Sequence, residues 1–337
     1  MTVSEEFTSL TGQFRGELLA LCYRMLGSAE EAEDLVQETY LRAWRSYAGF
    51  ERRSSMRTWL YRIATNVCLT ALERRSRRPL PSGLGAPADD PWAELVAGSE
   101  VPWLQPMPDV LLAGQQADPA TVVASRAGVR LAFVAALQYL SARQRAVLIL
   151  RDVLEWPAAE VADLLNTTTT AVNSGLRRAR AQLAQALPAE EELTEPGEPD
   201  RRAVLERFAA AFENDDASAL AHLLREDVVL EMPPILTWFT GRRNVTQFLA
   251  TQVFTMPGRF RMVPVMANGQ PAFAAYQRGP DGAYRAHEML VPTVTASGIA
   301  RIVVFLNPRL VEMSGLPSEY RTASAGPARA HDIAITP

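Results

Sequence analysis

The sequence predicts a multidomain chain in which two all-α units precede a C-terminal α+β domain. Apolar residues recur at helical spacing in the first and second units, and a Pro-, Gly- and Asp-rich stretch separates them. Beyond residue 200, short strand-like runs follow a first helix. The 337 residues, 48% of them hydrophobic, suffice for two or three separate cores. The predicted boundaries are 1–78 and 129–187 for the helical units, 79–128 and 188–199 for linkers, 200–315 for the α+β domain and 316–337 for a tail.

Composition restricts the class of protein. No apolar run approaches the roughly 20 residues of a membrane span, and the N-terminus MTVSEEFTSL lacks a signal-peptide pattern, so we expect a cytoplasmic protein without a membrane partner. Cys22 and Cys68 both lie in apolar helical patterns, which favours buried free thiols over a disulfide or metal site. With only three scattered histidines, we expect no metal and no cofactor. The net charge of −4 conceals two mildly basic helical units separated by an acidic linker.

The first unit contains an acidic helix and a second helix that ends in arginines. Apolar residues at 32, 35, 36, 39 and 43 have helical spacing and leave acidic residues on the other faces. The second helix, roughly 57–75, approaches an arginine cluster, and Pro79 ends it. A solvated face and simple charge capping are the alternative interpretations. Together the two ends suggest one protein partner and one nucleic-acid partner.

The second unit has the spacing of a helix-turn-helix motif. A short helix from Ala158 to Leu165, a turn at Asn166 and Thr167, and a longer helix from Thr169 to Leu187 fit this pattern. In the motif, the second helix enters the major groove, so its first turns would meet bases and phosphates. The residues in that position are Thr168, Thr169, Asn173, Ser174, Arg177 and Arg178.

The C-terminal domain shows helices followed by a curved antiparallel sheet. We expect a helix at 200–214, a strand-like segment at 228–234 and a helix from about 242. Strand-like runs follow at 259–266, 271–278, 283–294 and 298–306.

These segments together resemble a known family. AEDLVQETYLRAWR and TWLYRIATN within 10–78 resemble region 2 of bacterial extracytoplasmic-function (ECF) sigma factors, and LSARQRAVLILRDV, EVADLL and RRAR within 130–187 resemble region 4. The C-terminal AFENDD and IARIVVFLNP are similar to the SnoaL-like, or NTF2-like, cone fold. The whole resembles fused-tail sigma factors of the SigG or SigJ kind. The resemblance implies a region 2 helical bundle, a region 4 helix-turn-helix and a cone domain, in a promoter-specificity subunit of RNA polymerase.

The resemblance also implies roles for individual residues. The partners are core RNA polymerase, through its β′ clamp helices and β flap, and a two-part promoter; a separate anti-sigma factor is left open. The β′ contact falls on Asp34, Gln37, Glu38, Leu41 and Trp44. The residues that would contact the melted minus-10 element are Phe50, Trp59, Arg62, Asn66, Arg74, Arg75, Arg77 and Arg78. The last four arginines would bind backbone phosphate. Trp59 fits a core position better than a DNA contact. The minus-35 element falls to the region 4 residues named above.

Two segments depart from the family pattern. Region 4 reads TAVNSGL where the family usually reads G-T-V-K/R-S-R-L; Gly175 costs about 1 kcal/mol relative to Ala, while Asn173 can still pair with adenine. The linker is unusually long. Its excess of acidic residues resembles that of sigma linkers, which mimic a nucleic-acid single strand in the polymerase channel. A flexible spacer is the alternative interpretation. Trp103, Leu104 and Gln105, which prolines bracket, suggest that this part of the linker docks on another part of the protein.

The cone fold predicts a pocket in the C-terminal domain. Its candidate lining is Met232, Trp238, Phe239, Tyr276, His287 and Phe305. An enzymatic interpretation pairs His287 with Glu231 or another acid, and alternation keeps His287 and Glu288 from both pointing inward in a regular strand. We expect no catalytic residues and a regulatory interface with the sigma regions or polymerase. The alternative is a bifunctional protein whose C-terminal domain senses or converts a small molecule.

Overall fold

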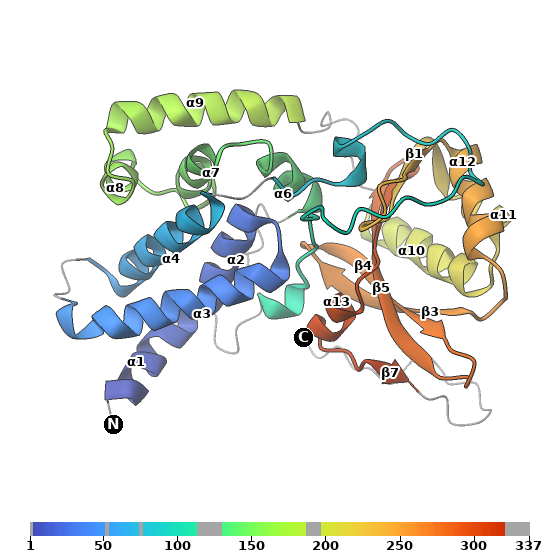
Figure 1. The fold of residues 1–337 in the computed structure, drawn as a ribbon, viewed down its shortest axis with the longest axis horizontal. Helices are drawn as coiled ribbons and strands as arrows, with labels where there is room; N and C mark the ends of the chain where they lie inside the picture. Colours follow the sequence, from blue (N-terminus) through green and yellow to red (C-terminus); the bar gives the residue numbers. More distant parts are fainter. Residues whose placement is uncertain (1–2, 51–53, 74–76, 113–129, 187–196, 321–337) are drawn as a thin grey trace.

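A computed structural model describes residues 3–50, 54–73, 77–112, 130–186 and 197–320 (Figure 1). The helical units lie on one side of the molecule, and the sheet with its own helices lies on the other. None of the helices within these ranges is long and apolar enough to span a membrane.

The first unit is a bundle built around one helix that is buried along most of its length. Every residue of α2 from Leu18 to Leu26 is buried, because α3 and α4 pack against it. Ser28 and Ser55 accept hydrogen bonds from backbone amides at the starts of α3 and α4, so both helices begin at serine N-caps. Cys22 and Cys68 are buried free thiols, as predicted, with their Sγ atoms 3.6 Å apart. The helices are α1 (Val3–Thr11), α2 (Arg15–Leu26), α3 (Ala29–Ser46) and α4 (Met56–Leu72).

The second unit confirms the predicted helix-turn-helix. Its turn contains Asn166 at φ 48°, in the left-handed region that asparagine tolerates. A capping box between Ser141 and Gln144 begins α7. The elements are α6 (Leu131–Leu137), α7 (Ala142–Leu148), the π-helical turn Ile149–Val153, α8 (Ala158–Leu164) and α9 (Thr169–Ala186).

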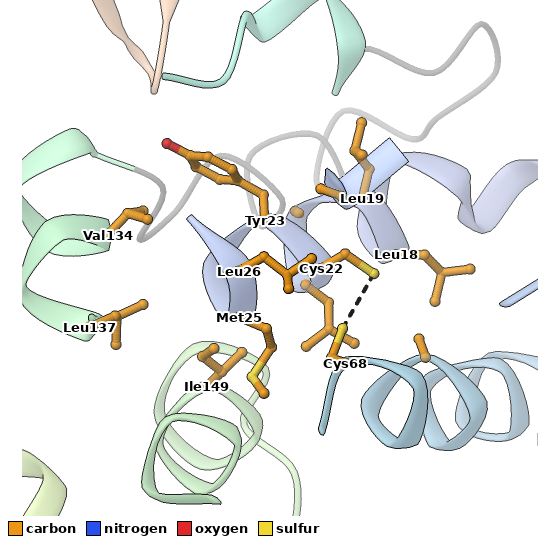
Figure 2. Close-up of a cluster of buried hydrophobic side chains, with 14 of the residues drawn as sticks. Leu18, Leu19, Cys22, Tyr23, Met25, Leu26, Cys68, Val134, Leu137 and Ile149 are labelled. Atoms are coloured by element: carbon orange, nitrogen blue, oxygen red, sulfur yellow. Dashed lines mark hydrogen bonds between the residues drawn. The ribbon is translucent and has the colours of Figure 1, made fainter. Parts of the chain in front are cut away.

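The two helical units share one hydrophobic core. Figure 2 shows Met25 and Leu26 of α2 facing Leu137 and Ile149 of the second unit. The rings of Tyr61 and Trp156 lie 5.6 Å apart across the same boundary. The sequence did not predict this direct packing.

The C-terminal domain is a seven-stranded sheet with helices against it. The strand order is β2-β1-β6-β5-β4-β3, and β7 pairs with β5. The predicted antiparallel sheet is confirmed except at β1 and β6, which run parallel. The strands are β1 (Leu224–Glu231), β2 (Phe239–Thr240), β3 (Phe260–Ala267), β4 (Gln270–Arg278), β5 (Tyr284–Thr295), β6 (Gly298–Phe305) and β7 (Glu319–Tyr320). The helices are α10 (Glu198–Glu213), α11 (Ala217–Ala221), α12 (Arg242–Phe248) and α13 (Pro308–Met313).

The centre of this sheet, at β5 and β6, is buried on both faces. On one face, Leu290 and Ile302 pack into a cluster with Phe208 of α10. Their neighbours Val291 and Val303 point the other way and join the core of the helical units. Because alternate residues of a strand face opposite sides, the C-terminal domain and the helical units are packed through apolar contact.

The described part of the linker, 77–112, is a packed strap along the C-terminal domain and not a free spacer (Figure 1). Gly98 N donates to Pro234 O at 2.8 Å, and Leu236 N donates to Val96 O at 2.7 Å. The strap then returns to α2, where Leu104 is fully buried. The predicted docking around Trp103 and Leu104 is thus confirmed. The acidic single-strand mimicry stays a prediction.

Candidate polymerase and promoter interfaces

The residues predicted to bind polymerase form one exposed stripe on α3. Asp34, Gln37, Leu41 and Trp44 recur at helical spacing on the solvent side, with Leu41 51% exposed. Trp44 is 41% exposed and packs its ring edge-on against Phe7, with centroids 5.2 Å apart. Glu38 is partly buried and pairs with Arg42 at 2.6 Å. The stripe therefore offers apolar anchors with an acidic rim while the C-terminal domain is docked.

The first turn of α3 is occupied by other parts of the chain. Glu31 pairs with Arg78 at 2.5 Å. Glu30 accepts from Asn307 Nδ2 at 3.4 Å and lies 3.7 Å from Arg309 Nε. The linker and the C-terminal domain thus both reach the end of α3 that immediately precedes Asp34.

The residues predicted to meet the minus-10 element gather on one face of α4. Trp59, Arg62 and Asn66 follow at helical spacing, and the latter two are exposed. Phe50 stacks on Trp59 with ring centroids 4.6 Å apart and a 30° tilt. Both rings are only partly buried. Trp59 therefore packs against the core on one side and leaves part of its ring exposed, next to Phe50, on the helix face that also carries Asn66.

The two described arginines after α4 have different surroundings. Arg74 and Arg75 lie outside the described residues. Arg77 is exposed, donates to Gly83 O and covers the Tyr139 ring. Arg78 has a side chain only 13% exposed, and it donates to Trp103 O besides pairing with Glu31. In this arrangement the linker and α3 already occupy the guanidinium of Arg78, and its phosphate contact stays a prediction.

The residues of α9 that were predicted to contact DNA are presented to solvent. Thr168, Thr169, Asn173, Arg177 and Arg178 are exposed, and Ser174 is partly so. Thr168 also caps the helix by accepting from Ala171 N at 3.1 Å. Arg180 forms a two-point ion pair with Asp152, which fixes α9 against the π-helical turn.

The six candidate pocket residues do not line one pocket, which corrects the prediction. Met232 and Phe239 belong to the cluster of the domain's own helices, where Phe239 stacks on Phe248. Phe305 faces the helical units, and Tyr276 joins a small cluster with Val311. Trp238 donates to Gly85 O of the linker at 3.0 Å. Aromatic side chains of α10 and α12 fill the helix-covered face.

His287 does not pair with Glu231. Glu231 is fully buried and accepts from Arg301 and from Ser82 N. His287 is instead the extra residue of a β-bulge, since Ala275 pairs with Glu288 while Tyr276 pairs with Ala286. The bulge breaks the alternation assumed from the sequence and brings His287 Nε2 to 3.8 Å from Glu288 Oε2. Burial lowers the pKa of His287 and raises that of Glu288 to about 7, so neutral forms are favoured.

A buried polar junction that the sequence analysis missed joins the three parts of the chain. The Tyr23 hydroxyl of α2 donates to Gln105 O at 2.9 Å and accepts from Asn268 Nδ2 at 2.7 Å. Asn268 lies between β3 and β4, and its side-chain Oδ1 also accepts from Met107 N at 2.9 Å. The backbone N of Asn268 donates to Met107 O. Asn268 has φ 58° and is fully buried. Only the pairing "Asn-Gly" between two strands, typical of a hairpin turn, marks this position in the sequence.

Comparison with known proteins agrees with this architecture. Family models match Sigma-70 region 2 at residues 10–78, Sigma-70 region 4 at 130–183 and a SnoaL-like domain at 205–303. The chain belongs to the ECF RNA polymerase sigma factors, which direct promoter-specific transcription initiation, and carries a C-terminal SnoaL-like domain.

Two mycobacterial sigma factors are similar over most of their length. The chain is 50% identical to the ECF RNA polymerase sigma factor SigG of Mycobacterium tuberculosis H37Rv over 93% of this chain and 84% of that protein. It is 29% identical to SigJ of the same organism over 84% of each chain. The crystal structure of SigJ superposes with a TM-score of 0.56 at 24% identity, covering 93% of this chain and all of that chain, which shows the shared fold.

Proposed function

We propose that α3 binds the β′ clamp helices of core RNA polymerase, that α4 with Phe50 captures the melted minus-10 element, and that α9 reads the minus-35 element. The observation that supports this most is the separation of exposed surfaces: an acidic and apolar stripe on α3, an aromatic and amide face on α4, and a polar face on α9. Charge sets the register of such interfaces, and buried aromatics supply affinity. The protein acts without catalytic residues of its own, since nucleotide chemistry belongs to the polymerase.

The test measures binding of the full chain to core polymerase and transcription from a cognate promoter. In Asp34→Ala with Glu38→Ala and in Trp44→Ala, we expect core affinity to fall by about tenfold or more, because hot-spot truncations cost about 2 kcal/mol. Glu206→Ala on the exposed face of α10 is the matched control. Unchanged core affinity in both stripe variants would contradict the β′ assignment.

We also propose that the C-terminal domain regulates the sigma regions in cis by holding them in the compact arrangement. Promoter elements at minus 35 and minus 10 are separated by about 80 Å of duplex at 3.4 Å per base pair. Regions 2 and 4 share one core here, so promoter binding requires them to separate. The strap and the sheet both contact this core, and their release would accompany the opening.

A further inference from the structure

A cleft lies where region 2, the linker strap and region 4 meet. Its volume is about 450 Å³, and Leu26, Arg77, Arg78, Glu100, Pro102 and Arg145 are among the residues that line it. This volume falls within the range of small-molecule sites, roughly 300–1,000 Å³, and is too small for duplex DNA or a folded partner. A molecule bound there would touch all the parts that must separate for promoter binding.

One wall of the cleft is a buried guanidinium without a carboxylate partner among the described residues. Arg145 of α7 is 4% exposed and donates to Met25 O, Leu140 O and the Gln138 side chain, while its Nε has no hydrogen-bond partner. Burial lowers its pKa to about 10, so it remains charged at neutral pH. A buried cation that is solvated only by neutral oxygens attracts an anion strongly, because the surroundings screen it little.

The other charged side chains leave the lining of the cleft with a net positive charge. Arg78 is balanced by Glu31, whereas Arg77 has no carboxylate partner within the described part of the chain. Glu100 is exposed and contributes one negative charge to the lining. Arg77 and Arg145 are therefore two cations without a carboxylate partner among the described residues, and Glu100 offsets one of their charges, so the lining carries a net positive charge that favours an anion. Guanidinium groups bind phosphate oxygens in a planar fork.

We propose that this cleft binds a small diphosphate-bearing molecule of about nucleotide size, and that the bound molecule stabilises the compact arrangement. The regulatory half of the proposal rests on the proposed sigma function, whereas the binding half does not. A ligand that binds the compact form and not the open form stabilises it by mass action.

Binding is tested by calorimetry on the full chain with pyrophosphate, ADP and, as an uncharged comparison, adenosine. We expect one site for pyrophosphate and for ADP and none for adenosine. Arg77→Gln should weaken binding about fivefold, and Glu100→Gln should strengthen it about threefold by removing a repulsive charge. Both side chains are exposed, so neither variant threatens folding. Arg243→Gln on the exposed face of α12 is the control and should match the wild type.

Absence of binding by pyrophosphate and ADP at millimolar concentration would overturn the proposal, as would wild-type affinity in both cleft variants. The regulatory half is tested by forming the promoter complex with core polymerase in the absence of nucleoside triphosphates. ADP should reduce complex formation, at about threefold lower concentration in Glu100→Gln. Binding of ADP without this reduction would overturn the regulatory half. A chain that binds ADP but forms no promoter complex would contradict the sigma function and leave the anion site standing.

Discussion

Buried polar side chains decide how the three parts of this chain fit together. Tyr23, Asn268 and the backbone of Met107 satisfy one another in a fully buried junction. Glu231 does the same between the strap and β6, through Ser82 N and Arg301. Leaving such a group unsatisfied costs about 1–3 kcal/mol, so these residues fix one docking geometry where apolar packing alone would allow several.

Glu288 predicts a pH dependence of stability in the C-terminal domain. Burial raises its pKa from 4.5 to about 7, so the stabilisation by the protonated form is complete below about 4.5 and is lost as the pH rises through 7. Relative to the wild type, Glu288→Gln should gain up to about 3 kcal/mol at pH 8 and little at pH 4.5. Chemical denaturation at both pH values measures this. Glu226→Gln, on an exposed position of β1, is the control, and parallel pH profiles for Glu288→Gln and the wild type would contradict the prediction.

At the scale of elements, glycines show where helices are free and where another segment restricts them. A Cβ at Gly175 in α9 would meet nothing within 4 Å, so this departure from the family pattern serves no close packing. A Cβ at Gly16 in α2 would lie 2.7 Å from the carbonyl oxygen of Leu112, where the strap crosses the helix. The same residue type is thus dispensable in one helix and required in the other.

Gly175→Ala should therefore stabilise the protein by about 0.5–1 kcal/mol, because alanine loses less backbone entropy in a helix. Gly16→Ala should destabilise it despite the same gain in propensity, since the strap must move away from α2. Thermal denaturation of the two variants provides the comparison. A shift of both melting temperatures in the same direction would contradict the packing of Leu112 against Gly16.

At the scale of the whole molecule, the sheet packs directly against the helical units. One face of β5 and β6 packs on the domain's own helices, and the other shares a core with α2 and its neighbours. The strap forms isolated β-bridges from Ala97 to Ile235, in the segment between β1 and β2, and from Pro108 to Ala267 at the end of β3. Releasing this arrangement would expose apolar surface, which is why we propose that the compact form is the resting state until polymerase, DNA or another partner compensates.

Tyr23→Phe tests whether this packing of the sheet and the strap on the helical units restrains promoter binding. The variant leaves Gln105 O and Asn268 Nδ2 without their shared partner, and we expect the closed arrangement to weaken by about 1–3 kcal/mol. Promoter-complex formation should rise several-fold, and limited proteolysis should cut the strap faster. Tyr40→Phe removes a single bond to Thr11 O inside region 2 and serves as the control. Equal behaviour of the two variants, or weaker promoter binding in Tyr23→Phe, would count against regulation in cis.

Local patterns were enough to predict most elements and the two sigma regions. Helical periodicity predicted α3, α4 and the helix-turn-helix, and strand-like runs predicted β3 to β6 within a few residues, because those signals depend on neighbours in the chain. The proposed contact residues on α3, α4 and α9 were predicted from the family resemblance, and the structure shows most of them exposed. The pocket could not be predicted this way, since the direction of Phe305 or Tyr276 depends on which face of the sheet is covered.

By itself, the sequence determined the modules: periodicity specified two helical units and an α+β domain, and the family resemblance identified the helical units as region 2 and region 4. The tertiary structure alone decided how they meet. The unbroken apolar runs in β5 and β6 require burial on both faces, yet they do not say what covers the second one. That choice rests on contacts between residues far apart in the chain, such as Tyr23 with Asn268 and Arg145 with Met25, which no local pattern encodes.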